Sequence, residues 1–339
     1  MNILDQAINV AKQNLSLCYG QHGILAGRHH FTDYWARDGF FAAFGSLAIG
    51  DREIVESMVE LFFKFQRQDG LIPYRIRNSP ITLGRYFGFH PKPFHHPKPS
   101  YRLRETGSEV LDGTTLTLLF LAELGLKNWR KSHDLIPSAE KAFHYLQSRE
   151  KYGLLWDGDM AEWMDSVKKS GNLLYTNVIY WRTFTRLADW LTSINLGKST
   201  QFRSKAESIA AALRHQLWNG RYFADWNDGR RHGHFYSFGN LLAVSWGLAT
   251  PSESKSILAE VEKSRIGFTL ETNVPAYPWR RIWWLSRLAG MADYQNRGLL
   301  WWQPGLAYIL ALKKVGKWEK ANKQLEIMAQ KLIRDGDFY

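Results

Sequence analysis

The sequence predicts an all-α fold, an (α/α)6 toroid in which helices of an outer and an inner ring alternate along the chain. Three observations lead to this prediction. Helical periodicity dominates, one-faced apolar segments alternate with segments that are apolar nearly all round, and a glycine recurs after each one-faced segment. A chain of 339 residues can bury a full core, and we expect a single catalytic domain over residues 1–339.

Six segments carry apolar side chains on one face, which is typical of outer helices that cover a core. One of them begins near Asp51, a good N-cap residue. The others cover residues 3–17, 138–149, 202–217, 252–263 and 318–333. Five inner segments are apolar nearly all round and are predicted to be buried on every side: 38–49, 112–124, 173–192, 236–248 and 304–314. The alternation is imperfect between 280 and 304, where two inner-type segments follow one another.

A glycine follows each predicted outer helix, with apolar residues close behind it. These glycines are Gly23, Gly70, Gly153, Gly220, Gly267 and Gly336. Glycine readily adopts the left-handed conformation that closes a helix at its C′ position, so the pattern predicts six outer helices that end alike. Six such units favour a closed ring. A helical solenoid is the alternative, but its repeats would be more even in length.

The composition favours a sugar as the partner, and neither nucleic acid nor a membrane. The formal charge is +12, but the basic residues are scattered along the chain and form no long run. The chain has 15 Trp and 15 Tyr, which suit stacking on sugars, although core packing is the simpler explanation for any one of them. No segment resembles a signal peptide or a membrane span, and Cys18 is the single cysteine, so we expect a cytoplasmic protein.

Connection lengths indicate where a site would lie. Links from inner to outer helices can be short, whereas every link from an outer to an inner helix is long. In an alternating double ring all links of one kind share one rim, and long loops in compact domains are usually functional. We therefore expect the site at that rim. The longest link, residues 67–111, contains six prolines and is predicted to be an ordered lid.

The first long loop ends in YWARD at residues 34–38, directly before an inner helix. Arg37 and Asp38 can donate to and accept from neighbouring sugar hydroxyls, with Trp35 as a stacking surface. An internal Arg–Asp ion pair that caps the helix explains the same spacing about as well.

The third loop contains the sequence WDGDMAEWMD at residues 156–165. Glycosidic cleavage needs a carboxylic acid that protonates the departing oxygen, and burial beside aromatic rings helps to keep a carboxyl group protonated. Asp165, beside Trp163, meets this requirement, and a role as the N-cap of the next helix is equally open. Three further acids are more typical of solvated loop residues or helix caps: Asp157, Asp159 and Glu162.

Three motifs in order carry a family resemblance: YWARD at 34–38, EWMD at 162–165 and LLWWQP at 299–304. Together they resemble the glucoamylase and amylo-α-1,6-glucosidase (glycogen-debranching) group of six-hairpin glycosidases, over essentially the whole chain. The resemblance implies a hydrolase of α-glucosidic bonds. It also implies that Arg37 and Asp38 hold hydroxyls of the non-reducing-end glucose and that Asp165 donates the proton.

The late motif resembles the aromatic wall of that family, although Gln303 separates Trp302 from Pro304. The residues that we expect to contact substrate are Tyr34, Trp35, Arg37, Asp38, Asp112, Glu162, Trp163, Trp301, Trp302 and Gln303.

The resemblance leaves the catalytic base open. The family's base is a Glu just after a G-x-F-Y segment in the sixth loop, and this sequence ends in GDFY, so that Glu would lie beyond Tyr339. Acid and base would flank the scissile bond from opposite loops, which suits inversion with carboxyl groups about 6.5–9.5 Å apart. Glu271 and Asp337 are the possible internal substitutes. We hypothesise a truncated chain that keeps the sugar pocket and the acid.

Two other functions remain as alternatives. Without the base, the chain can be a non-catalytic carbohydrate-binding toroid, which a turnover measurement separates from an enzyme. Another α-toroid enzyme, such as an isoprenoid cyclase or a lyase, would show clustered acidic metal ligands or an aliphatic cavity, and neither is evident. His90, His95 and His96 lack metal-ligand spacing, so no metal or other cofactor is expected. The linkage that is cleaved and the oligomeric state are left open.

Overall fold

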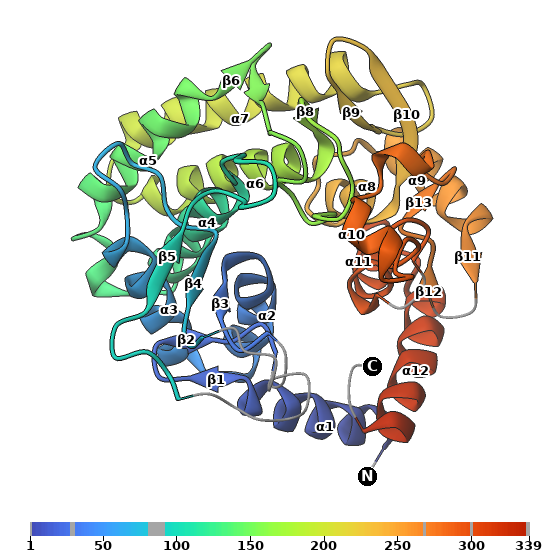
Figure 1. Cartoon of the computed structure of the whole chain (residues 1–339), viewed down its shortest axis with the longest axis horizontal. Helices are drawn as coiled ribbons and strands as arrows, with labels where there is room; N and C mark the ends of the chain where they lie inside the picture. Colours follow the sequence, from blue (N-terminus) through green and yellow to red (C-terminus); the bar gives the residue numbers. More distant parts are fainter. Residues whose placement is uncertain (1, 28–30, 81–91, 267–268, 299–300, 337–339) are drawn as a thin grey trace. The chain divides into compact units, whose positions relative to one another are not determined.

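The structure is a computed structural model that describes residues 2–27, 31–80, 92–266, 269–298 and 301–336. The chain divides into two compact units. Unit 1 comprises Met1–Ala11, Lys151–Trp181 and Glu207–Tyr339, and unit 2 comprises Lys12–Glu150 and Arg182–Ala206. Figure 1 shows the order of helices and strands along the chain.

All the long helices that the periodicity predicts are present. The one-faced helices are α1 (Ile3–Leu17), α3 (Arg52–Lys64), α5 (Ile136–Ser148), α7 (Leu196–Leu217), α9 (Pro251–Lys263) and α12 (Trp318–Asp335). The apolar helices are α2 (Ala36–Ile49), α4 (Asp112–Leu126), α6 (Leu174–Leu191), α8 (Ser237–Ser245) and α11 (Trp302–Lys314). Local chemistry fixes some of their ends: Thr250 and Glu253 form a capping box at the start of α9. Among the described residues, no helix has both the length and the apolar character needed to cross a bilayer.

Burial divides the apolar helices into two kinds. Helices α4 and α8 are enclosed almost completely, as predicted. Helix α11 leaves Leu306 and Leu310 exposed by 41% and 55%, and α2 exposes Gly45 and Ala48. The prediction of burial on every side is therefore wrong for α2 and α11, because apolar composition does not say on how many sides a helix has neighbours.

The irregular stretch between residues 280 and 304 is also not a second inner helix. Its described part holds the 3-10 helix η3 (Trp279–Arg281) and the five-residue helix α10 (Trp284–Leu288). Trp284 and Leu288 are 51% and 76% exposed. This apolar segment lies at the surface, a placement that its composition does not predict.

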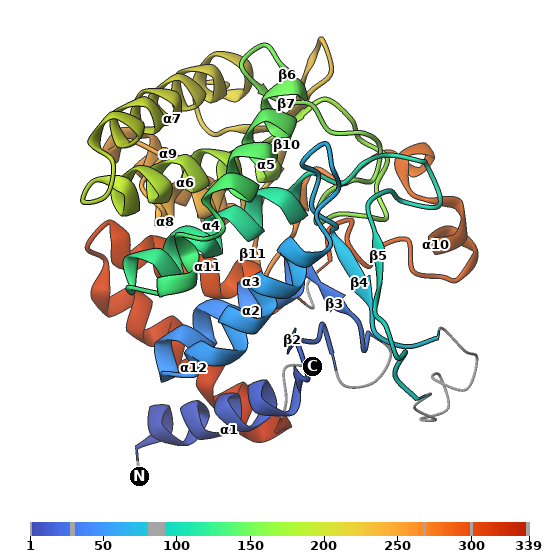
Figure 2. The ribbon, with the colours of Figure 1, turned by 90° about the vertical axis from the view of Figure 1, so that its left-hand side faces the viewer.

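In unit 2, aromatic side chains join α2, α3 and α4. The ring centre of Phe40 lies 5.3 Å from that of Phe62 and 5.0 Å from that of Phe120. Strands β3 (Tyr34–Trp35), β4 (Arg75–Arg77) and β5 (Lys98–Ser100) form an antiparallel sheet, and Figure 2 shows them side by side. Link 67–111 thus contributes two strands to a sheet, and its residues 81–91 lie outside the described residues.

In unit 1, α8 packs against α9 and α11, and α11 packs against α12. The four-stranded sheet has the order β13 (Asn273–Val274), β10 (Arg231–Tyr236), β9 (Ala224–Asn227) and β8 (Asn172–Leu173), with antiparallel neighbours. Strands β8 and β10 run directly into α6 and α8, as β3 runs into α2 in unit 2. A short strand thus fixes the start of several apolar helices.

The recurring glycines have a different role from the predicted one at most positions. Among the described glycines of this set, only Gly336 is the left-handed cap of its helix, at the end of α12. Gly267 lies outside the described residues. Two others lie in tight hairpins after the helix: Gly23 in β1–β2 (Tyr19–Gly20, Gly23–Ile24) and Gly153 in β6–β7 (Glu150–Lys151, Leu154–Leu155). In the β6–β7 turn, Tyr152 and Gly153 have φ of 60° and 79°. Two successive positive φ angles are typical of a two-residue hairpin loop, which explains the preference for glycine.

Candidate active site

Asp165 lies in a closed loop of unit 1. Two backbone hydrogen bonds join Asp157 and Gly171, with N–O distances of 2.8 and 2.9 Å, so the intervening chain leaves and returns at one point. Gly171 has φ of 117°, and a Cβ atom there would lie 2.3 Å from the carbonyl oxygen of Asn227. Glycine is therefore required at this closure by its backbone conformation and by the lack of space.

A buried ion cluster holds the inside of this loop. Lys169 Nζ lies 2.7 Å from Glu162 Oε1 and 2.8 Å from Asp225 Oδ1, and none of the three side chains is more than 1% exposed. The hydroxyl of Tyr277 donates to Asp225 Oδ2. Because Glu162 and Lys169 stand on either side of Asp165 in the chain, their ion pair fixes the span of the segment that carries Asp165.

The cluster has a defined charge state. Burial alone would lower the pKa of Lys169, but the carboxylates of Asp225 and Glu162 outweigh burial and raise it. Burial and the nearby Asp225 raise the pKa of Tyr277 well above its ordinary value. Burial and Glu162 do the same for Tyr236, whose ring centre lies 4.6 Å from Lys169 Nζ. At neutral pH the lysine is therefore charged and both phenols are neutral.

The Asp165 side chain is held by Gln295. The Gln295 amide nitrogen lies 3.2 Å from Asp165 Oδ1 and 2.8 Å from the carbonyl oxygen of Trp163, and it donates to both. The Gln295 oxygen accepts hydrogen bonds from Ser166 N at 2.8 Å and from Ser166 Oγ. Gln295 is 3% exposed, whereas Asp165 is partly exposed, so a buried amide positions a carboxyl group that solvent reaches.

Trp163 and Trp301 bring two of the sequence motifs together. Their ring centres lie 4.8 Å apart in an edge arrangement, and Trp163 also packs on Phe238 at 5.7 Å. The indole nitrogen of Trp301 donates to the carbonyl oxygen of Tyr294 at 2.8 Å. Trp302 is 7% exposed as the first residue of α11, and Gln303 beside it is half-buried. The segments around Asp165 and Trp301 therefore share one aromatic cluster.

The first motif lies in unit 2, at the junction of β3 and α2. Arg37 is buried, and its Nε donates to Asp112 Oδ2 at 2.7 Å, so the Arg37 guanidinium has an ion-pair partner in α4. Asp38, the next residue, is exposed. Trp35 is half-buried beneath the guanidinium of Arg75, which lies 4.6 Å from its ring centre. Tyr34 is fully buried.

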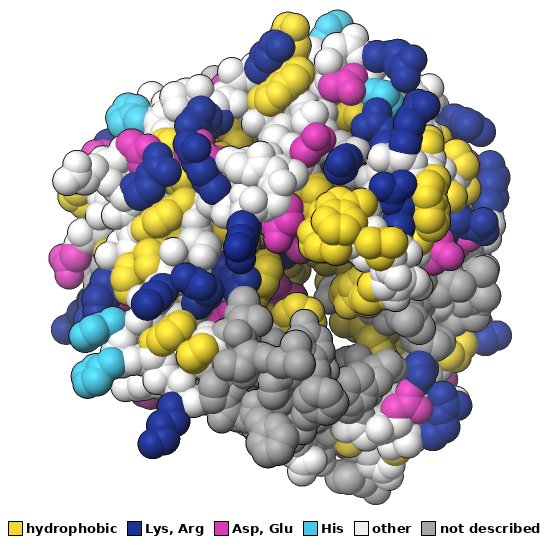
Figure 3. All heavy atoms as spheres, in the orientation of Figure 1, with side chains coloured by type: hydrophobic (Ala, Val, Ile, Leu, Met, Phe, Trp, Pro, Cys, Tyr) yellow, Lys and Arg dark blue, Asp and Glu magenta, His cyan; other side chains and the backbone are white. Residues whose placement is uncertain are grey.

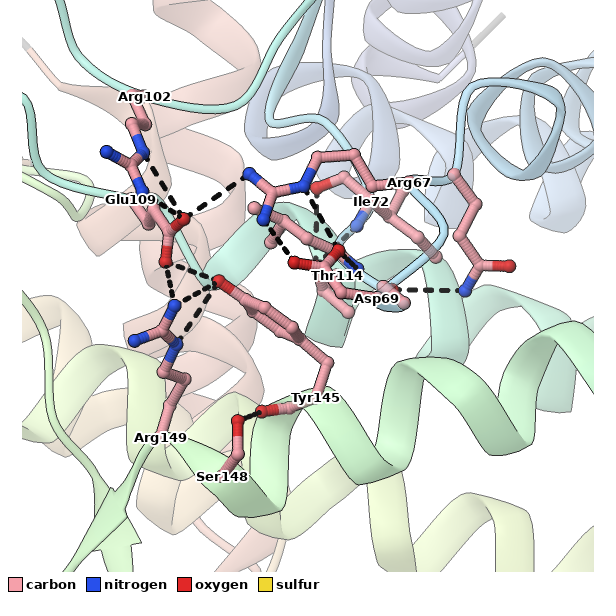
Figure 4. Close-up of polar contacts among 12 residues, drawn as sticks. Arg67, Asp69, Ile72, Arg102, Glu109, Thr114, Tyr145, Ser148 and Arg149 are labelled. Atoms are coloured by element: carbon pink, nitrogen blue, oxygen red, sulfur yellow. Dashed lines mark hydrogen bonds and ion pairs between the residues drawn. The ribbon is translucent and has the colours of Figure 1, made fainter.

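In unit 2, Glu109 lies shortly before Asp112 in the chain and is the centre of a network of hydrogen bonds and ion pairs. Figure 4 shows the residues of this network. Glu109 accepts from Arg67 at 3.3 Å and from Arg102 at 2.8 Å, and it also accepts from Arg149 and from the hydroxyl of Tyr145. Burial alone would raise the pKa of Glu109, but the hydrogen bond from Tyr145 and the guanidinium groups outweigh burial and lower it. The network fixes the chain just before α4, and hence the backbone of Asp112.

The proposed base residues differ in their surroundings. Glu271 is 8% exposed and accepts from Arg297 Nε at 2.6 Å. Asp337 lies outside the described residues. Asp157 and Glu162 are fully buried, so their interpretation as solvated loop acids is wrong; the chain folds inward there, and Lys169 compensates the charge of Glu162.

Sequence reasoning missed Lys169, Asp225, Tyr277, Gln295 and Glu109. One signal was available for Asp225: it interrupts the apolar run YFADW at 222–226, and an acid in a buried strand requires a partner. Gln295 and Lys169 carry no comparable signal, since their partners are set by the tertiary fold. In the part of the chain that the structure describes, no group of three or more His, Cys, Asp or Glu residues is arranged to hold a metal ion.

No protein-family description and no curated protein matches this chain by sequence. Solved structures resemble it in fold. The mannosylglycerate hydrolase from Thermus thermophilus has a TM-score of 0.70 at 13% identity, over 97% of this chain and 92% of that chain. A glycosidase variant in complex with glucose has a TM-score of 0.66 at 13% identity, over 98% and 85%.

A rhamnosidase from Klebsiella oxytoca with rhamnose bound has a TM-score of 0.66 at 14% identity. The match covers 98% of this chain and 55% of the rhamnosidase, so this chain spans about half the length of that protein. Identities this low show the fold alone. The chain has the all-α fold of the α/α-toroid glycosidases, and the fold class predicted from the sequence is confirmed.

Proposed function

We propose that this chain is a glycoside hydrolase that cleaves α-glucosidic bonds with inversion and that Asp165 is its general acid. The position of Asp165 carries the proposal: its partly exposed carboxyl group is held by the buried Gln295, which also donates to the backbone carbonyl of Trp163. General acids need this fixed geometry, because the proton must reach an oxygen within hydrogen-bond distance. The fold likeness to glycosidases supports the reaction class.

In this proposal Asp165 protonates the departing glycosidic oxygen, while a carboxylate on the other side of the sugar takes a proton from the attacking water. Arg37 and Asp38 hold hydroxyls of the non-reducing-end glucose, and Trp301 and Trp302 provide aromatic contact. Residues 1–339 act as one catalytic domain, with 67–111 as its lid. Glu271 or Asp337 serves as the base.

The test compares leaving groups in the variant Asp165→Asn. We expect its turnover of maltose to fall by about 10²–10⁴-fold, because the amide cannot donate a proton. Turnover of α-glucosyl fluoride should fall much less, since fluoride leaves without protonation. Asp159→Asn, in the same loop, is the matched control and should keep its activity on both. An Asp165→Asn variant that hydrolyses maltose at the wild-type rate would exclude Asp165 as the acid.

A second candidate is a carbohydrate-binding protein without turnover. The ion pair between Glu271 and Arg297 favours this second function. Of the two candidate bases, Glu271 is the one that lies among the described residues, and its carboxylate is already bound to a guanidinium. Calorimetric titration with glucose and a hydrolysis assay on the same sample separate the two functions. The second candidate is supported if the chain binds glucose without turnover and if this binding persists in the variant Glu271→Gln.

A further inference from the structure

One segment of unit 1 gathers apolar side chains at the surface. Its exposed side chains are Trp279 (60%), Trp284 (51%), Leu285 (39%), Leu288 (76%), Met291 (47%) and Tyr294 (40%). In Figure 3 hydrophobic side chains face the viewer at the place where Figure 1 draws α10, which lies in this segment. Contiguous exposed apolar groups of this kind mark interaction sites in soluble proteins.

The segment is hydrogen-bonded to the loop of Asp165. Trp283 N donates to Ser166 O at 2.8 Å, and Lys168 N donates to Arg281 O at 2.7 Å. Between these two bonds, Ile282 and Val167 form an antiparallel bridge. Ser166 is the next residue after Asp165, and the exposed Trp284 is the next residue after Trp283. The segment that carries the apolar face is therefore joined to the backbone next to the proposed general acid.

The same segment is basic. Arg280 is exposed and Arg287 partly so, and no carboxylate in the described part of the chain is ion-paired with either. Arg297, in contrast, is paired with Glu271. The guanidinium of Arg287 lies 5.7 Å from the ring centre of Trp279. A guanidinium beside an aromatic ring can bind a carboxylate with its fork while the ring stacks on the attached sugar.

We propose that Trp279, Arg280, Trp284 and Arg287, together called the aromatic–basic face, bind the leaving-group side of the substrate, and that this side is an acidic oligosaccharide. The exposed indoles provide stacking surfaces for sugar rings, and the two arginines can pair with anionic groups on those sugars. Several exposed rings in one segment fit a chain of sugars better than a single small acid. The inference rests on the proposed function, because that function defines the leaving-group side.

The test measures the affinity of the full chain for tetragalacturonate and for its methyl ester, which has the same sugar chain without the charges. We expect the acid to bind about 10-fold more tightly than the ester, with an affinity that falls as salt is added. The double variant Arg280→Gln/Arg287→Gln should abolish this preference, and Trp284→Ala should weaken the binding of both ligands. Trp318→Ala and Arg230→Gln remove an exposed Trp and an exposed Arg elsewhere, and they should bind like the wild type.

Equal affinity for the acid and its ester overturns the inference, and so does unchanged binding by the variants of the aromatic–basic face. A dimer in sedimentation that dissociates in Trp284→Ala would assign the face to a second copy and would overturn it as well. Maltose turnover separates this result from failure of the proposed function. Maltose turnover without a preference for the acid removes only this inference, whereas preferential binding of the acid without maltose turnover counts against the proposed function and leaves the ligand class of the aromatic–basic face unchanged.

Discussion

Gln295 and Asp165 lie 130 positions apart in the chain, and a 3.2 Å hydrogen bond joins their side chains. Gln295 also binds the backbone on both sides of Asp165, at the carbonyl of Trp163 and the N–H of Ser166. One buried amide therefore sets the position of the carboxyl group and of the backbone that carries it. On the proposed function, Gln295 is a positioning residue for the general acid.

Replacing Gln295 by Leu should lower kcat on maltose by about 10-fold or more and change KM little, because the lost hydrogen bonds orient the acid and not the sugar. The variant Gln295→Glu adds a second carboxylate near Asp165, and like charges raise a carboxyl pKa. The limb of the pH profile that reports the acid should then move to higher pH. A profile that keeps its wild-type position in Gln295→Glu would show that Gln295 has only a structural role.

Replacing Lys169 by Met should destabilise the fold by about 3–5 kcal/mol, because Glu162 and Asp225 then remain buried without their cation. Lys168→Met is the matched control, since Lys168 is the next residue and is exposed. Chemical denaturation of both variants measures the effect. Equal free energies of unfolding for Lys168→Met and Lys169→Met would contradict the view that the buried cluster holds the loop.

The chain should lose stability above about pH 10. The pKa values of Lys169, Tyr236 and Tyr277 are raised in the folded state, so the unfolded chain releases these protons first. When the native state binds more protons, the free energy of unfolding falls as pH rises. Melting temperatures between pH 8 and pH 11 test this. Tyr277→Phe removes one such group and should show a shallower decline; a decline as steep as that of the wild type would exclude a contribution from Tyr277.

Replacing Glu109 by Gln should destabilise the fold by about 1–3 kcal/mol at neutral pH, since a carboxylate that accepts from several guanidinium groups is lost. We expect a destabilisation near the lower end of this range, because the side chains of Arg102 and Arg149 are 61% and 42% exposed and solvent screens their charges. The lowered pKa of Glu109 gives stability that is present above its unfolded pKa and lost as pH falls through the folded pKa. The variant and the wild type should therefore converge in stability at acid pH. A constant difference from pH 7 to pH 3 would contradict this assignment.

Replacing Arg37 by Lys should weaken glucose binding by about 10-fold, because an ammonium cannot donate to Asp112 as the Arg37 Nε does and, on the proposed function, present further N–H donors to the sugar. Calorimetric titration with glucose measures this affinity. Arg52→Lys, at a surface ion pair with Glu56, is the matched control. If the two variants bind glucose equally, Arg37 has only a structural role.

The helices could be predicted from the sequence because the spacing of apolar residues within a segment reflects both the helical period and the face that the helix buries. Each predicted helix of the 3.6-residue pattern is present, and their alternation led to the fold class that the solved structures confirm. The recurring glycines were also real signals, although the sequence does not distinguish a helix cap from a hairpin turn. Gly153 and Gly336 both have positive φ, but Gly153 lies in a turn between strands and Gly336 caps a helix.

The partners of the site residues were decided only by the tertiary structure. The pairs of Arg37 with Asp112, Lys169 with Asp225 and Asp165 with Gln295 are separated by 75, 56 and 130 positions. Nothing in the sequence near either member of a pair specifies the other, because these contacts form when separate loops and helices pack. The sequence thus determined which segments become helices and which carboxyl group to examine, whereas packing determined which charges are buried and which amide holds Asp165.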